Sequence, residues 1–221
     1  MRRLLGSTVV LSLLLVAACE SAEEEAEVPE VAVTGERVQI LSTYNGRYTK
    51  HGWNHYGPGY FELDSETGVL TARGGMGLLW YGVKEVGNFI LELEYMCADE
   101  QTNSGVFLRV PGVPSSNDYI YHSWEIQISH PGEGVHRNGA VYDAEAPSEP
   151  AGNPPGEWNS MKITFQGNRI GVEVNGTAVI DWEAEPRGKI EDFADSGYIG
   201  LQNHDDRSPV YFRNIFLTEL P

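Results

Sequence analysis

The chain has 221 residues and a formal net charge of −17, from 32 Asp and Glu residues against 15 Lys and Arg residues. Its 41% hydrophobic content excludes a disordered chain, and its 25 glycines and 11 tyrosines are typical of a turn-rich β protein. The acidic balance argues against nucleic acid and against a polybasic grip on anionic lipid, because both need a basic surface.

The N-terminus has the features of an export signal. Arg2 and Arg3 precede an apolar run, 4–18, that is too short to span a bilayer as a mature helix. Small residues end this run directly before Cys19, which resembles the lipobox of bacterial lipoproteins, where the signal is cut before a cysteine that then carries lipid. We therefore predict a signal peptide at 1–18 and a lipid on Cys19 as the membrane contact, on the periplasmic or outer-membrane face of a bacterium. An ordinary secretory signal with an incidental cysteine is the alternative interpretation.

The next segment is acidic and nearly free of apolar residues. Six glutamates lie within 20–30, which predicts a solvated, self-repelling tether over 19–36 and a folded domain over 37–221. Lipid on Cys19 would leave Cys97 without a disulfide partner, because the chain has only 2 cysteines. Cys97 is then expected to be a small buried residue at a strand end.

The body of the chain alternates apolar and polar residues with the period of β-strands. In 124–128, Trp124, Ile126 and Ile128 face one way while Glu125 and Gln127 face the other. The same pattern predicts strands over 89–95, 104–109, 124–128, 161–165, 170–174, 178–180, 198–204 and 210–217. Asn175-Gly176 predicts a type I′ hairpin turn, since both residues tolerate a positive φ. Many short strands with turns between them indicate a sandwich or a barrel.

The polar positions of three strands are candidates for a binding surface. Alternation groups Glu125 with Gln127, groups Gln202 with His204, and places Arg109 opposite Leu108. Such a surface suits hydroxyl-rich ligands, because each hydroxyl both donates and accepts a hydrogen bond. Aromatic residues could supply flat faces for sugar rings: Trp80, Tyr81, Tyr119, Tyr121 and Tyr142. The alternative is a plain solvent-exposed sheet face.

Some other polar residues have two interpretations. Asp205 and Asp206 are expected to be loop charges or a cap, with a weak calcium site as the alternative. His122, His130 and His136 are either extra ligands or surface residues. The segment 132–157 is long for a plain connection, and long loops on a rigid scaffold often carry function.

An ordered set of short motifs resembles the 3-keto-disaccharide hydrolase domain family over residues 38–220. The motifs are Gly87-Asn88-Phe89, 103–109, 124–128, 139–142, 155–159, 168–170, 174–176, 200–204 and 210–215. The resemblance implies an all-β, concanavalin A-like jelly-roll sandwich of two antiparallel sheets. It also implies action on glycosides whose sugar is oxidised to a ketone at C3.

The implied chemistry is an elimination followed by hydration. A C3 ketone acidifies the C2 hydrogen, and the enolate formed by its removal expels the C1 substituent before water adds. The reaction needs a base near C2, an electrophile near the C3 oxygen and an acid for the leaving group. A divalent metal ion is one candidate electrophile, and no other cofactor is expected.

The resemblance, carried onto these motifs, points to Glu125 and His204 as the acid/base or metal-ligating pair and to Arg109 as the group that holds the enolate oxygen or a sugar hydroxyl. The expected substrate contacts are Gln127, Gln202, Asn103, Tyr142 and Trp80. Residues 103–105 could instead form a turn or a close packing contact. The competing functional hypothesis is a non-catalytic carbohydrate-binding module or surface interaction protein on the same fold.

Overall fold

A computed structural model describes residues 35–130 and 132–221. The predicted signal peptide, Cys19 and the acidic segment up to residue 34 lie outside this part. None of the helices within the described part is long and apolar enough to cross a membrane.

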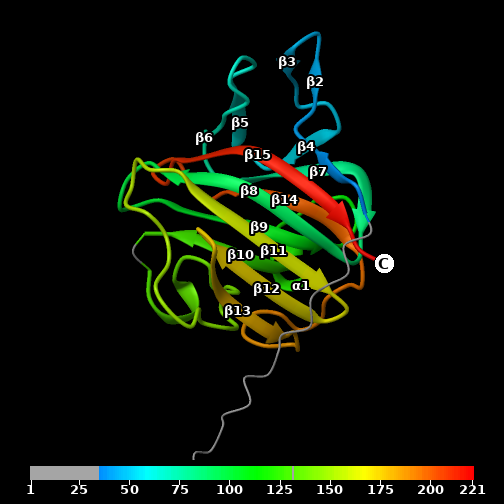
Figure 1. Cartoon of the computed structure of the whole chain (residues 1–221), viewed down its shortest axis with the longest axis vertical. Helices are drawn as coiled ribbons and strands as arrows, with labels where there is room; N and C mark the ends of the chain where they lie inside the picture. Colours follow the sequence, from blue (N-terminus) through cyan, green and yellow to red (C-terminus); the bar gives the residue numbers. More distant parts are fainter. Residues whose placement is uncertain (1–34, 131) are drawn as a thin grey trace, which may run out of the picture. The chain divides into compact units, whose positions relative to one another are not determined.

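Two antiparallel sheets form the domain (Figure 1). The larger has eight strands, in the order β13 (Thr177–Glu183), β12 (Arg169–Val174), β11 (Asn159–Gln166), β8 (Phe89–Cys97), β15 (Val210–Glu219), β6 (Leu70–Arg73) and β5 (Tyr60–Leu63), with β1 (Arg37–Gln39) also paired to β15. The smaller has five, in the order β10 (Trp124–Ser129), β9 (Asn103–Val110), β14 (Gly197–Asn203), β7 (Gly77–Val86) and β4 (Trp53–Tyr56). The remaining elements are a hairpin of β2 (Thr43–Tyr44) and β3 (Arg47–Tyr48), the helix α1 (Tyr119–His122) and the 3₁₀ helix η1 (Gly134–His136).

The core lies between the two sheets, and alternation along the strands explains it. On β8, the residues from Phe89 to Cys97 at every second position are at most 3% exposed, whereas Glu92 and Glu94 point outward and pair with Arg37 and Arg213. On β10, the apolar positions are fully buried and join the same core cluster as those of β8. Cys97 ends β8 as a buried free thiol within the described part of the chain, as predicted.

The predicted strands after residue 88 are all present, and the Asn175-Gly176 turn has the two positive φ angles, 52° and 81°, that a type I′ turn requires. The strands before residue 88 were not predicted individually. Most of them have only two to four residues, and the ten-residue β7 begins with four consecutive buried positions, so its alternation is hidden.

One face prediction is wrong, that for Arg109. A β-bulge near the end of β9 pairs Phe107 with Gly200 but Val110 with Tyr198, so that Leu108 and Arg109 together occupy the place of one residue. Arg109 has a φ of 54° and its side chain turns toward the larger sheet, with its guanidinium carbon 3.5 Å from the Phe165 ring centre.

The guanidinium of Arg109 lies between the two sheets and contacts both. Its Nε donates to the carbonyl of Gly87 and its Nη2 to the carbonyl of Gly167, both at 2.9 Å. The side chain is therefore a buried link between two turns, and the role of enolate holder does not fit its position.

Candidate active site

The polar face of the smaller sheet points away from the core and carries most of the predicted site residues. Glu125 lies opposite Phe107 in the β10–β9 register, Gln127 lies opposite Gly105, and Gly200 on β14 is also paired to Phe107. Gln202 is two residues after Gly200 and so shares this face, as the alternation predicts. The face is covered rather than open, since Glu125 is 4% exposed and Gln127 is 3% exposed.

Part of the cover is the segment that follows η1. The amide of Tyr142 donates to the carbonyl of Glu125 at 2.8 Å, and Gln127 exchanges backbone hydrogen bonds with Gly139 and Ala140. These bonds fasten the long 132–157 connection along the edge of β10 and bring Tyr142 beside Glu125. The connection thus contributes Tyr142 to the candidate site.

The centre of this face is an ion pair that sequence analysis did not predict. Lys189, in the connection between β13 and β14, places its Nζ 2.9 Å from Oε2 of Glu125. The same ammonium lies 4.2 Å from the ring centre of Tyr142, within cation–π range. We call Glu125, Lys189, Tyr119, Tyr142, Gln202 and His204 the Glu125 cluster. Lys189 carries no local sequence signal that would have identified it.

Burial raises the pKa of Glu125 above its usual value, because the carboxylate loses its hydration. Lys189, His204 and the amide of Gln202 favour the carboxylate and offset part of that increase. A carboxyl group shifted toward neutral pH is suited to act as a general base.

Two phenols border the same carboxyl group. Burial raises the pKa of Tyr119, and the charge of Glu125 raises it further; the pKa of Tyr142 is raised for the same two reasons. Both phenols are therefore neutral at physiological pH and can donate hydrogen bonds to a ligand.

The amide oxygens beside Glu125 are suited to accept hydrogen bonds from a ligand. Gln127 donates from Nε2 to Oδ1 of Asn103 at 3.1 Å, while its Oε1 has no hydrogen-bond partner among the described residues. Oε1 of Gln202 is likewise buried and unpartnered in that part of the chain. A buried acceptor without a partner is costly, so donation from a ligand hydroxyl would satisfy it.

Gly105 makes room for Glu125. A Cβ at this position would lie 2.4 Å from Oε1 of Glu125, closer than any real contact. The close packing that sequence analysis gave as one interpretation of residues 103–105 is therefore present, and Asn103 of the same segment also contacts Gln127.

His204 follows the last residue of β14 and is 43% exposed, with its Nδ1 2.9 Å from Oδ2 of Asp205. Asp205 also accepts a hydrogen bond from the amide of Arg207, at 2.6 Å, so it is a capping loop charge, as expected. The imidazole is thus held at the solvent side of the cluster by its neighbour.

Trp80 lies on the same face but packs into it. The residue is 7% exposed, and its ring packs at a tilt of 52° against Tyr198 with the ring centres 4.7 Å apart, within an apolar cluster that also includes Phe107 and Tyr119. Two of the histidines have identifiable contacts: His122 pairs with Asp192, and His136 packs on Tyr142 at 4.8 Å.

The donor set does not fit a divalent cation. Glu125 and His204 are two ligands, and no group of three or more His, Cys, Asp or Glu side chains able to hold a metal occurs within 35–130 and 132–221. Oε2 of Glu125 already contacts the ammonium of Lys189, which supplies the positive charge at this position.

The sequence of the domain matches the family model described as a 3-keto-alpha-glucoside-1,2-lyase-like domain over residues 39–218. The chain belongs to this family. A 3-keto-alpha-glucoside-1,2-lyase-like domain is a carbohydrate-active domain of the glycoside hydrolase type, and the recognition made from the motifs is confirmed.

Solved structures show the same architecture as this lyase-like domain. A candidate glycosyl hydrolase from Parabacteroides distasonis is 28% identical, with a TM-score of 0.67 over 84% of this chain and 100% of that one. A Bacillus subtilis protein of unknown function with a galectin-like fold is 10% identical, with a TM-score of 0.55 over 83% and 94%. The carbohydrate-binding module CBM66 from Bacillus subtilis is 16% identical, with a TM-score of 0.51 over 76% and 96%. No curated protein sequence matches the chain. The predicted all-β, concanavalin A-like sandwich is confirmed.

Proposed function

We propose that the domain cleaves 3-keto-glycosides by elimination and hydration, with Glu125 as the base. The observation that carries this proposal is a buried carboxyl group of raised pKa, paired with Lys189 beside amide oxygens that have no hydrogen-bond partner among the described residues. The family to which the chain belongs supports the substrate class.

The proposed reaction has two stages. Glu125 takes the proton from C2 of the 3-keto sugar, and the electron pair forms an enolate with its charge on the C3 oxygen. The ketone then re-forms as C1=C2 develops and the C1–O bond breaks, and the leaving oxygen takes a proton to give an alcohol. Water adds to C1 and a proton returns to C2, so that the net change is hydrolysis.

The roles follow from the positions of the charges. The ammonium of Lys189 would stabilise the negative charge on the C3 oxygen, because a buried cation beside a developing oxyanion lowers the barrier. His204, at the solvent side, would protonate the leaving group. Gln127 and Gln202 would accept hydrogen bonds from sugar hydroxyls, and Tyr142 and Asn103 would help to orient the ring.

The first experiment measures monosaccharide release from a 3-keto-disaccharide and from its unoxidised parent. We expect release only from the 3-keto sugar, and loss of release in Glu125→Gln. Glu173→Gln is the matched control, because Glu173 lies on the other sheet and forms an exposed pair with Lys162. Full activity of Glu125→Gln would refute the mechanism. A parallel sample with chelator should release the same amount of sugar, because the donor set that the described residues place around Glu125 does not fit a divalent cation; loss of release would overturn that conclusion.

The same reaction in D₂O distinguishes elimination from the route through an oxocarbenium ion. Elimination and hydration place one deuterium on C2 of the released sugar, whereas the two-carboxylate route leaves C2–H intact. Substrate incubated without protein corrects for spontaneous exchange next to the ketone. Binding of the parent glycan without release from either sugar would instead favour a carbohydrate-binding module.

We further propose that lipid on Cys19 anchors the domain at a bacterial membrane, outside the cytoplasm. Mass spectrometry of the protein from the membrane fraction of expressing cells should show an N-terminal peptide that begins at Cys19 and carries the added mass of acyl chains. An N-terminal peptide with unmodified Cys19 would refute the anchor without affecting the catalytic proposal.

A further inference from the structure

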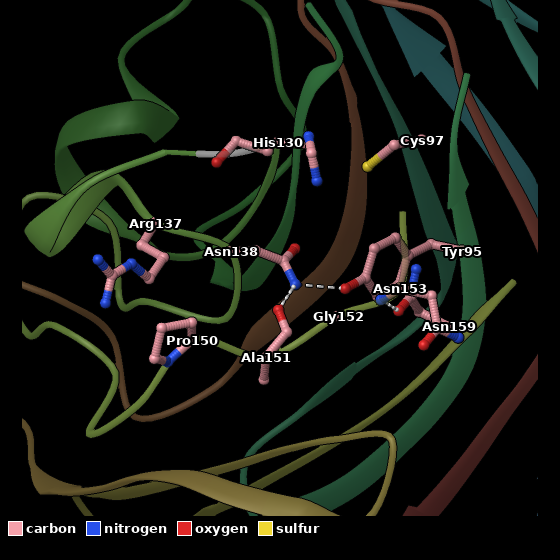
Figure 2. Close-up of a pocket in the computed structure, with 11 residues that line it drawn as sticks. Tyr95, Cys97, His130, Arg137, Asn138, Pro150, Ala151, Gly152, Asn153 and Asn159 are labelled. Atoms are coloured by element: carbon pink, nitrogen blue, oxygen red, sulfur yellow. Dashed lines mark hydrogen bonds between the residues drawn. The ribbon is translucent and has the colours of Figure 1, made fainter. Parts of the chain in front are cut away.

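A hollow of about 180 Å³ lies where β8 and β10 end, and none of the Glu125 cluster lines it (Figure 2). By the same kind of measure, a single buried water needs roughly 10–15 Å³, so this space admits a small organic molecule. Its lining includes Tyr95, His130, Arg137, Asn138 and Gly152.

Asn138 is held in one orientation with its oxygen left unused. The side chain is 6% exposed, and its Nδ2 donates to Oη of Tyr95 at 2.6 Å and to the carbonyl of Ala151 at 2.9 Å. The carbonyl of Ala151 can only accept, so this contact identifies which end of the amide is nitrogen, and Figure 2 shows the side chain bridging the two partners. Oδ1 has no hydrogen-bond partner among the described residues.

A second buried polar atom at the hollow belongs to the imidazole of His130. Nδ1 of His130 is buried and has no hydrogen-bond partner within the described part of the chain. In Figure 2, the imidazole of His130 and Oδ1 of Asn138 lie on the same side of the Tyr95–Asn138 hydrogen bond. Buried polar atoms in native proteins are nearly always satisfied, so two of them at one hollow point to a missing partner.

The backbone at Gly152 packs closely against the amide group of Asn138. Gly152 has a φ of 121°, and a Cβ there would lie 2.8 Å from Nδ2 of Asn138. Only glycine lets the chain approach the amide so closely in this conformation. The wall of the hollow at Gly152 is therefore closely packed.

The charge of the lining restricts the chemistry of an occupant. Among the residues that the structure describes, no Asp or Glu lines the hollow, and Arg137 is the one lining residue with a permanent charge. A divalent cation would need carboxylate oxygens, so this lining does not suit one. A hydroxyl group does fit, because it can donate to Oδ1 of Asn138 and accept from the imidazole or from the Tyr95 phenol.

We propose that this hollow is a second binding site, for a neutral polyhydroxylated molecule the size of a monosaccharide. The proposal does not rest on the catalytic role of Glu125, because no residue of the Glu125 cluster lines the hollow.

The test is a titration of the purified chain with D-glucose, followed through the imidazole NMR signals, with the His130 signal assigned from its loss in His130→Gln. We expect a saturable shift of the His130 signal that persists in Glu125→Gln. Asn138→Ala should raise the dissociation constant at least tenfold, whereas Asn117→Ala, at an exposed position, should leave it unchanged.

Asn138→Ala also removes the hydrogen bonds to Tyr95 and Ala151 and could therefore fold poorly, so a second variant is included. His130→Phe leaves those bonds intact, and calorimetry should show weaker glucose binding in the Glu125→Gln/His130→Phe protein than in Glu125→Gln alone. A shift that rises linearly without saturation would mean that the hollow holds water only. A shift lost in Glu125→Gln would place the sugar at the Glu125 cluster. Either result would overturn the proposal.

Discussion

Replacing Lys189 with methionine tests the physical basis of the candidate active site. Glu125 is only 4% exposed and its partner Lys189 is 15% exposed, so the pair belongs to the buried class of ion pairs. Removal of one partner from a buried pair costs about 3–5 kcal/mol, because the remaining charge is left without compensation. For a domain of this size each kcal/mol corresponds to roughly 2–4 °C, so the expected fall in Tm is roughly 6–20 °C.

The cost should depend on pH in a defined direction. The pKa of Glu125 is raised by burial above its usual value of 4.5, and Lys189→Met removes the largest group that offsets this increase. A group whose pKa is higher in the folded than in the unfolded state binds protons preferentially on folding. The penalty is therefore absent below the unfolded pKa and grows as pH rises through the folded pKa. The loss of stability should be larger at about pH 8 than at about pH 5.

Urea denaturation at the two pH values measures both effects, with wild type as reference. Lys162→Met is the matched control, because Lys162 forms a pair with Glu173 whose side chains are 44% and 38% exposed. Exposed pairs contribute about 0–1 kcal/mol, so this variant should change little at either pH. A Lys189→Met protein as stable as Lys162→Met, or equally destabilised at both pH values, would refute the account of the buried pair.

Three further predictions concern positions around this site and in the core. Gly105→Ala should abolish activity by displacing the carboxyl group of Glu125. Gly171→Ala should retain activity, because a Cβ at this position would lie no closer than 3.8 Å to any neighbouring atom. Equal activity of the two variants would contradict the close packing at Gly105. Arg109→Met should lower the free energy of unfolding by about 3 kcal/mol, because two charged hydrogen bonds are lost. The kcat of the folded variant should stay near that of wild type. A loss of kcat without a loss of stability would restore the catalytic role of Arg109. Cys97, whose pKa burial raises to about 12, should react with iodoacetamide at neutral pH only after unfolding, and mass spectrometry of the native protein should detect no adduct.

Local signals in the sequence were sufficient for the strands after residue 88 and for the hairpin at Asn175-Gly176. Alternation placed Glu125 and Gln127 on the face opposite Trp124, because successive side chains on a strand point to opposite sides. Gly176 and its neighbour Asn175 specify their turn through φ angles that few other residues adopt. These features depend on residues close together in the chain, so no tertiary information was needed.

Alternation failed at Arg109 because a bulge changes the parity of every residue after it, and a bulge depends on the partner strand as well as on its own residues. The structure also changed the interpretation of Trp80, which packs against Tyr198 where an exposed sugar contact had been expected. Whether a side chain on a given face is exposed depends on what covers that face, which the strand's own sequence does not record.

The sequence by itself determined the sandwich, the polar face of the smaller sheet and the family. Only the tertiary structure decided which charges meet on that face, because Lys189 reaches Glu125 across 64 positions of the chain. The raised pKa of Glu125 is likewise a product of packing, since its largest cause is the burial of the carboxyl group in the folded chain. The residue types at this site are thus visible in the sequence, but the pKa of Glu125 depends on burial and on nearby charges that arise only on folding.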